Sequence, residues 1–159
     1  MKVLLPLPRR DYDPTDVAVS WKILADAGHA VTFATPDGQV ARADPVMLDG
    51  IGLDFWGRIP VLKRLKLIGL VLRADRRARA AHCALVDNAA FLAPLSYAQI
   101  GAHDGGVNDL DAPLLPGGHA QGMREYLESK LLQHVVAEFF DAGKPVAAVC
   151  HGVVLAARS

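Results

Sequence analysis

The first part of the chain alternates an apolar strand, an amphipathic helix and a second apolar strand. Residues 2–6 (KVLLP) form a short aliphatic run, and residues 15–27 carry apolar side chains at helical spacing. Gly28 stands where a left-handed helix cap belongs, and a second strand over residues 30–34 follows. Since a helical crossover of this kind joins parallel strands, the pattern predicts an α/β protein with a doubly wound, mostly parallel sheet.

The same alternation returns in the second half of the chain. Residues 112–116 form an apolar run that leads into a Pro-Gly-Gly-His turn, and a long helix begins at Ser129, whose hydroxyl can cap it. Gly143 can close that helix, and Pro145 prevents its continuation. The next apolar run, residues 145–149, is predicted to be a fully buried strand.

Residues 40–100 interrupt this pattern. An amphipathic stretch over residues 61–72 and an Arg- and Ala-rich helix over residues 74–88 stand where the alternation predicts a strand. We therefore expect residues 40–100 to be an insertion or a cap segment within a single domain that comprises residues 1–159.

Composition excludes several classes of protein. The chain has 159 residues, of which 52% are hydrophobic, enough for one core without disulfide or metal staples. Its 17 basic and 17 acidic residues cancel, so no net positive field exists to attract nucleic acid or anionic lipid. The N-terminal apolar run is too short for a signal peptide, and charges interrupt the apolar region 59–72, so we expect no membrane span. The expected location is the cytoplasm, where the two cysteines stay reduced.

Cys150 occupies the position richest in chemistry. It follows the strand 145–149 in a sharp turn into a helix over residues 153–157, and open α/β sheets bind their ligands at such strand ends. The amides of the turn and the helix dipole favour the thiolate, and His151 can act as a base or as an imidazolium partner. Cys83 lies in a helix-like stretch without such a turn and is expected to be a packing residue.

Four segments carry a resemblance to a known family. They are DYDPTDVAVSWKILADAGHAVTFATPDG (11–38), LLPGGHAQGMREY (114–126), FFDAGKP (139–145) and PVAAVCHG (145–152). In this order they resemble the DJ-1/PfpI superfamily, which has the flavodoxin-like, class I glutamine amidotransferase-like fold. The resemblance covers the whole chain and implies a mostly parallel sheet with flanking helices.

The resemblance also implies a set of site residues. In such proteins the cysteine of the elbow is the nucleophile, the next histidine assists it, and the glycine-rich loop after the preceding strand supplies oxyanion-binding amides. An acidic residue in the first helix holds a proton between its carboxyl group and the sulfur. The corresponding residues here are Cys150, His151, Gly117, Gly118, His119 and Asp16. Many members carry Glu in place of Asp16, so the shorter carboxyl is expected to contact the thiolate less closely or through water.

Two departures bear on the reaction. True class I glutamine amidotransferases carry glycine and glutamine where this chain has Ala148 and Val154, so glutamine hydrolysis is disfavoured. Their catalytic histidine and glutamate lie further downstream, whereas this sequence ends at Ser159. Members of the superfamily generally continue beyond that point, so the C-terminal part of the domain is apparently missing.

The leading hypothesis is a cofactor-independent, cysteine-dependent lyase or hydrolase that acts on small carbonyl compounds, similar to the glyoxalase III and deglycase branch. Cys150 would add to an aldehyde such as methylglyoxal, the Gly117 and Gly118 amides would stabilise the oxyanion, and His151 or Asp16 would move the proton that yields lactate. We expect no metal site, since no residues have zinc-site or EF-hand spacing. The expected partners are a small-molecule substrate and a second copy of the chain in a homodimer.

Other functions stay open at this stage. One alternative is a stress-response chaperone or redox sensor. In such a protein the apolar segment 51–72 would bind unfolded clients, and Cys150 would be oxidised to the sulfinic acid. An amidase-like or isocyanide hydratase-like hydrolase would use the same nucleophile. His119 is expected to position its loop rather than to transfer protons.

Overall fold

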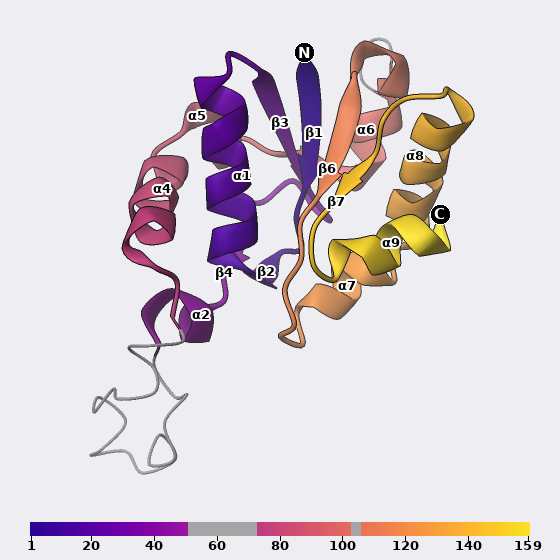
Figure 1. Cartoon of the computed structure of the whole chain (residues 1–159). Helices are drawn as coiled ribbons and strands as arrows, with labels where there is room; N and C mark the ends of the chain where they lie inside the picture. The colour runs from indigo at the N-terminus through magenta and orange to yellow at the C-terminus, as the bar shows by residue number, and fades with distance from the viewer. Residues whose placement is uncertain (51–72, 103–105) are drawn as a thin grey trace.

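The structure, a computed structural model, describes residues 1–50, 73–102 and 106–159. Five parallel strands form the central sheet in the order β5-β3-β1-β6-β7, which confirms the predicted doubly wound α/β architecture (Figure 1). These strands are β1 (Lys2–Pro6), β3 (Ala30–Thr35), β5 (Leu95–Ser96), β6 (Ala112–Leu115) and β7 (Ala147–Ala148). A second, two-stranded parallel sheet consists of β2 (Arg10–Tyr12) and β4 (Arg42–Ala43).

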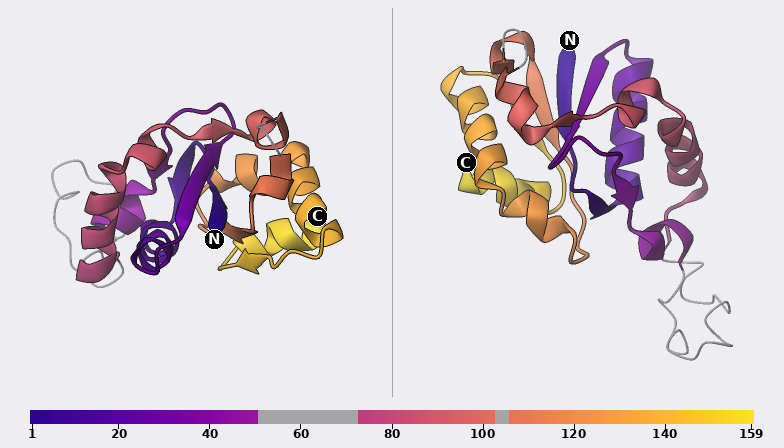
Figure 2. Two further views of the ribbon diagram at one scale, coloured as in Figure 1. Left: turned by 90° about the horizontal axis from the view of Figure 1, so that it is seen from above. Right: turned by 180° about the vertical axis from the view of Figure 1, so that it is seen from behind.

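Helices cover both faces of the central sheet (Figure 2). Helices α1 and α4 lie on one side and helices α6 and α8 on the other, while β2, β4 and α7 gather near the carboxyl ends of the strands (Figures 1 and 2). The described helices are α1 (Pro14–Asp26), α2 (Pro45–Asp49), α4 (Arg76–Val86), α5 (Ala89–Leu92), α6 (Tyr97–Ala102), the 3-10 helix η2 (Gly106–Asp109), α7 (Met123–Leu127), α8 (Lys130–Asp141) and α9 (Gly152–Arg158). None of them is long and apolar enough to cross a membrane.

The N-terminal strand–helix–strand unit forms as predicted. The Asp13 carboxylate accepts the Thr15 and Asp16 amide protons, and Pro14 occupies the first turn, so α1 begins with a complete N-cap. Gly28 ends the helix with a φ of 78°, the left-handed conformation that glycine adopts without strain. The buried face of α1 packs against the sheet through Val17, among others.

Helix α8 also begins and ends where the sequence predicts. The Ser129 hydroxyl accepts the Leu132 amide proton at 3.2 Å, and Gly143 follows the helix with a φ of 65°. The apolar stripe is narrower than the sequence suggests, because Leu131 and Phe140 are 46% and 48% exposed. Only the central part of the stripe therefore faces the sheet.

The prediction of a fully buried strand over residues 145–149 is wrong. The strand β7 comprises Ala147 and Ala148 only, Ala147 is exposed, and Val149 is 37% exposed. The reason is its place in the sheet: within the described residues β7 is an edge strand that pairs with β6 alone. An apolar sequence cannot distinguish an edge strand from a central one.

The predicted insertion or cap over residues 40–100 stays a prediction. Helix α4 lies within the Arg- and Ala-rich stretch and packs against α1, as expected for a helix there. The amphipathic stretch 61–72 and the larger apolar segment 51–72 lie outside the described residues.

Lys144 fixes the turn after α8 to the loop that precedes β6. Its Nζ donates hydrogen bonds to the carbonyl oxygens of Val107, Asn108 and Leu110 at 2.8, 3.0 and 2.6 Å. These carbonyls belong to or directly follow the short helix η2, so the ammonium group binds the carbonyl oxygens at the end of that helix. The Lys144 ammonium group thereby holds the residues that precede β6 beside those that precede β7.

We predict that Lys144→Met lowers the free energy of unfolding by about 2 kcal/mol, because the three carbonyls lose a charged donor. Chemical denaturation of both proteins measures this difference. The matched control is Lys22→Met, which removes an exposed ion pair with Asp26 and should cost less than about 0.5 kcal/mol. Equal effects of the two substitutions would contradict the role assigned to Lys144.

Candidate active site

Cys150 lies in a strained turn between β7 and α9. Its φ is 52°, and within the described residues Asp11 is the other non-glycine residue with a positive φ. His151 has returned to a helical conformation, and α9 begins at Gly152. Such a turn projects its side chain from the end of the sheet, and the Cys150 thiol is exposed.

Gly152 is required for this turn. A Cβ atom at this position would lie 2.1 Å from the Leu115 carbonyl oxygen and 2.8 Å from that of Pro116, so no other residue fits without a backbone shift. The close contact places the first turn of α9 against the end of β6. The loop that follows β6 therefore passes directly beside Cys150.

Gly117, in that loop, is the point at which three parts of the chain meet. A Cβ atom there would lie 2.5 Å from the Cβ of Cys150, 2.8 Å from the His151 amide nitrogen and 2.9 Å from Oδ2 of Asp16. The loop after β6, the elbow after β7 and the first turn of α1 thus converge. The structure brings together Asp16, Gly117, Cys150 and His151, the residues that the resemblance places in one site.

Asp16 presents a carboxyl group whose pKa lies above its ordinary value. Burial raises its pKa, and the negative charge of Asp13 raises it further. The Gly117 amide, the Cys150 thiol and the charge of His119 act in the opposite direction without reversing the shift. The atom Oδ2 is buried and has no hydrogen-bond partner of ordinary geometry in the described structure, so a donor group can approach it from the site.

Two histidines lie on the open side of the thiol. Nδ1 of His151 is 3.4 Å from Sγ of Cys150, within the range of a hydrogen bond to sulfur. The His119 ring lies 6.5 Å from the His151 ring, centroid to centroid, and both side chains are exposed. An imidazole can therefore exchange a proton with the sulfur, and a second imidazole stands beside the first.

The loop after β6 offers free amide donors. The carbonyl oxygen of Gly117 accepts the Asp13 amide proton at 3.1 Å, whereas the amides of Gly118 and His119 have no acceptor among the residues that the structure describes. Backbone amides of this kind are suited to binding an oxyanion next to a nucleophile. The amides of Gly118 and His119 are therefore available as hydrogen-bond donors in the described structure, and their role in binding an oxyanion stays a prediction.

Two features of the site region were not predicted. Cys83 is an exposed residue of α4 instead of a packing residue, because the buried face of that helix consists of Ala78, Ala81 and Leu85. Helix α4 lies on the far side of α1 from the elbow, so Cys83 does not join the site (Figure 1). The increase that the negative charge of Asp13 causes in the pKa of Asp16 was also not predicted, although the Asp-Pro pair at the start of the helix could have indicated it.

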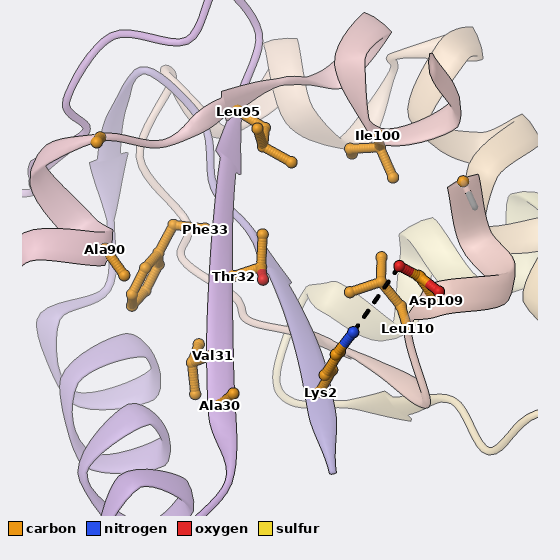
Figure 3. A pocket seen from close by; sticks show the side chains of 12 residues that line it. Lys2, Ala30, Val31, Thr32, Phe33, Ala90, Leu95, Ile100, Asp109 and Leu110 are labelled. Atoms are coloured by element: carbon orange, nitrogen blue, oxygen red, sulfur yellow. Dashed lines mark ion pairs between the residues drawn. The ribbon is translucent and has the colours of Figure 1, made fainter. Parts of the chain in front are cut away.

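A separate cavity of about 340 Å³ lies along β3, from Ala30 to Phe33 (Figure 3). Apolar side chains such as Phe33, Leu95 and Ile100 line it, and Lys2 faces Asp109 across 3.8 Å at its margin. None of the residues around Cys150 contributes to its walls. The elbow and this cavity are therefore distinct parts of the molecule.

Comparison with known proteins settles the family. The family described as "ThiJ/PfpI family-like" matches residues 7–159, nearly the full chain. The chain belongs to the ThiJ/PfpI-like family. Among curated proteins, this family member is similar to an uncharacterized protein (C14C4.04) of Schizosaccharomyces pombe, with 25% identity over 139 residues, which cover 87% of this chain and 45% of the yeast protein.

Solved structures share the fold of this ThiJ/PfpI-like chain. DJ-1beta of Drosophila melanogaster is 18% identical with a TM-score of 0.57, and the match covers 99% of this chain and 59% of the fly protein. Glyoxalase III of Candida albicans is 21% identical with a TM-score of 0.55, and the match covers 98% and 59% of the two chains. The chain thus spans less than two thirds of the length of each of these relatives.

We predict that iodoacetamide alkylates Cys150 at least about tenfold faster than Cys83 near neutral pH. Both thiols are exposed, so accessibility does not separate them, but among the residues that the structure describes only Cys150 has an imidazole nitrogen at hydrogen-bond distance, 3.4 Å. Brief labelling followed by peptide mass spectrometry measures both rates in one sample. Faster labelling of Cys83 would remove the basis for assigning Cys150 as the nucleophile of this ThiJ/PfpI-like chain.

Asp16 should make stability depend on pH. Because its pKa is raised above the ordinary 3.8, the stability present while the carboxyl is protonated is lost as the pH rises through the folded-state pKa. The asparagine side chain of the Asp16→Asn variant stays neutral at every pH. The difference in free energy of unfolding, variant minus unmodified protein, should therefore increase from about pH 4 to about pH 7. Denaturant titrations across this range test the trend, and a constant or falling difference would contradict it.

Proposed function

We propose that the chain is the nucleophile-bearing part of a cysteine-dependent enzyme that acts on small carbonyl compounds, as glyoxalase III does. The observation that carries the proposal is the convergence at Gly117, which puts the Cys150 thiol, the His151 imidazole and the Asp16 carboxyl around one point. Family membership supports a cysteine enzyme but does not by itself choose the substrate. Methylglyoxal is the substrate we infer.

The first step is addition of sulfur to the aldehyde carbon. His151 takes the thiol proton, the Cys150 sulfur forms a bond to the carbon, and the π-electron pair of the carbonyl moves to oxygen. The free amides of Gly118 and His119 stabilise this oxyanion, which takes up the proton to give a hemithioacetal. No atom is lost or gained in this step.

The second step is an internal redox exchange between neighbouring carbons. A base removes the hydrogen on the hemithioacetal carbon as a proton, and a proton returns to the adjacent carbonyl carbon through an enediol. The carbon bonded to sulfur is thereby oxidised to a thioester and its neighbour is reduced to an alcohol. Water then releases lactate and restores the thiol, so the overall reaction adds one water to methylglyoxal and needs no external oxidant or reductant. We assign the proton transfers to His151 and Asp16.

A redox sensor is the second candidate, and the exposure of Cys150 favours it. An accessible thiol next to an imidazole reacts readily with peroxide to a sulfenic and then a sulfinic acid. The apolar segment 51–72, which would serve a chaperone, lies outside the described residues. An amidase-like or isocyanide hydratase-like activity would use the same nucleophile, and its substrates belong in the same assay.

The cytoplasmic location and the homodimer stay predictions. Val149, directly after β7, and Val153 of α9 are 37% and 54% exposed, and these apolar side chains support a second copy against this part of the described structure.

We predict that the full-length protein converts methylglyoxal to lactate without glutathione. Cys150→Ser should lower the rate at least about 100-fold, because a serine hydroxyl is far less ionised than a thiol. The matched control is Cys83→Ser, which removes an equally exposed thiol outside the site and should stay within about twofold of the unmodified enzyme. Enzymatic lactate determination gives both rates.

Two results would contradict the proposal. In one, the folded full-length protein forms no lactate, and in the other, Cys150→Ser keeps the rate. If methylglyoxal is inert but peroxide converts Cys150 to the sulfinic acid, the sensor function replaces the enzyme. Conversion of isocyanides or amides in place of aldehydes would keep Cys150 as nucleophile and change the substrate class.

A further inference from the structure

Asp11 has a backbone conformation that side chains other than glycine rarely adopt. Its φ is 70°, and it lies in β2 at the point where the pairing with β4 shifts register, between Arg10 and Tyr12. A bulge of this kind turns one side chain away from the direction of its neighbours. Asp is one of the few residue types that tolerate this left-handed conformation, and the strain persists only where contacts hold it.

The contact that holds Asp11 is made with the loop beside Cys150. Oδ2 of Asp11 accepts the Gly122 amide proton at 2.9 Å, although 111 positions separate the two residues. A Cβ atom on Gly122 would lie 2.6 Å from this oxygen and 2.8 Å from the Arg10 carbonyl oxygen. The loop backbone itself therefore packs against β2, with the carboxylate at the point of contact.

The other end of the same loop is held by the same short segment. The Asp13 amide donates to the Gly117 carbonyl oxygen at 3.1 Å. A Cβ atom on Gly118 would lie 3.1 Å from the Asp11 carbonyl oxygen, so the loop also touches the segment between its two ends. The free amides of Gly118 and His119 lie between the two hydrogen bonds and can shift if either end is released.

We propose that Asp11 is a positioning residue that fixes the oxyanion-binding loop, residues 117–122, next to Cys150. It acts through its hydrogen bond to Gly122 and touches neither the thiol nor the substrate. A carboxylate is a stronger acceptor for an amide than a neutral oxygen, and its short side chain allows β2 and the loop to approach closely. The inference rests on the proposed function for its effect on turnover, but not for its effect on the loop.

The test compares Asp11→Gly with Asp11→Asn in the full-length protein. Glycine relieves the backbone strain and removes the acceptor, whereas asparagine keeps both an acceptor oxygen and a tolerance for positive φ. For Asp11→Gly we expect at least about tenfold faster amide hydrogen exchange at Gly122 and a kcat at least about tenfold lower, with KM changed less than kcat. Asp11→Asn should restore most of both quantities.

Alkylation of Cys150 by iodoacetamide is the internal control, because this reaction does not need the loop. Its rate should stay within about twofold in Asp11→Gly. Gly122→Ala disturbs the same contact from the loop side and should reproduce the effects of Asp11→Gly. Unchanged hydrogen exchange in Asp11→Gly, or failure of Asp11→Asn to rescue, would overturn the proposal. If no carbonyl substrate is turned over, hydrogen exchange still decides the role of Asp11, and only the proposed function fails.

Discussion

The absence of a side chain at Gly117 is the condition on which the site depends. Three segments approach this residue so closely that one added carbon would collide with Cys150, His151 and Asp16 together. The sheet makes this approach possible, because β1 and β6 are neighbours and end at the same edge as β7. Strand order and the missing Cβ atom of Gly117 thus place three groups side by side: the Asp16 carboxyl of α1, the loop after β6 and the Cys150 thiol.

Burial gives Asp16 its chemical character. A carboxyl group at the exposed start of a helix would ionise readily, since the helix dipole favours a negative charge there. Here burial and the charge of Asp13 act against ionisation, and one oxygen has no partner of ordinary geometry in the described structure. The same Asp13 that stabilises α1 as its N-cap therefore also raises the pKa of the carboxyl group one turn further along.

Local patterns predicted much of this arrangement. The strand over residues 2–6, the cap of α8 at Ser129 and the turn at Cys150 all follow from residues close together in sequence. The meeting of Asp16, Gly117 and Cys150 was implied by the resemblance to the DJ-1/PfpI superfamily, and the shared carboxyl edge of the parallel strands is what makes it possible.

The features that the sequence did not predict depend on distant neighbours. Whether the strand at Ala147 is central or at an edge depends on what pairs with its far side, and whether Cys83 is buried depends on which face of α4 meets α1. Asp11 carries no local sign of its contact with Gly122, because the two residues lie 111 positions apart. Burial, strand position and long-range hydrogen bonds are set by the assembled fold.

The arrangement of Lys144 has a chemical consequence under the proposed function, in which the protein meets reactive carbonyl compounds. Such compounds attack amines that have a free electron pair, and exposed lysines are common targets. An ammonium group has three N–H donors, and three backbone carbonyls accept from that of Lys144. Forming an adduct there would require the loss of a proton and the rupture of these hydrogen bonds. We therefore expect the lysine that joins η2 to the end of α8 to react more slowly with such compounds than a lysine without these contacts.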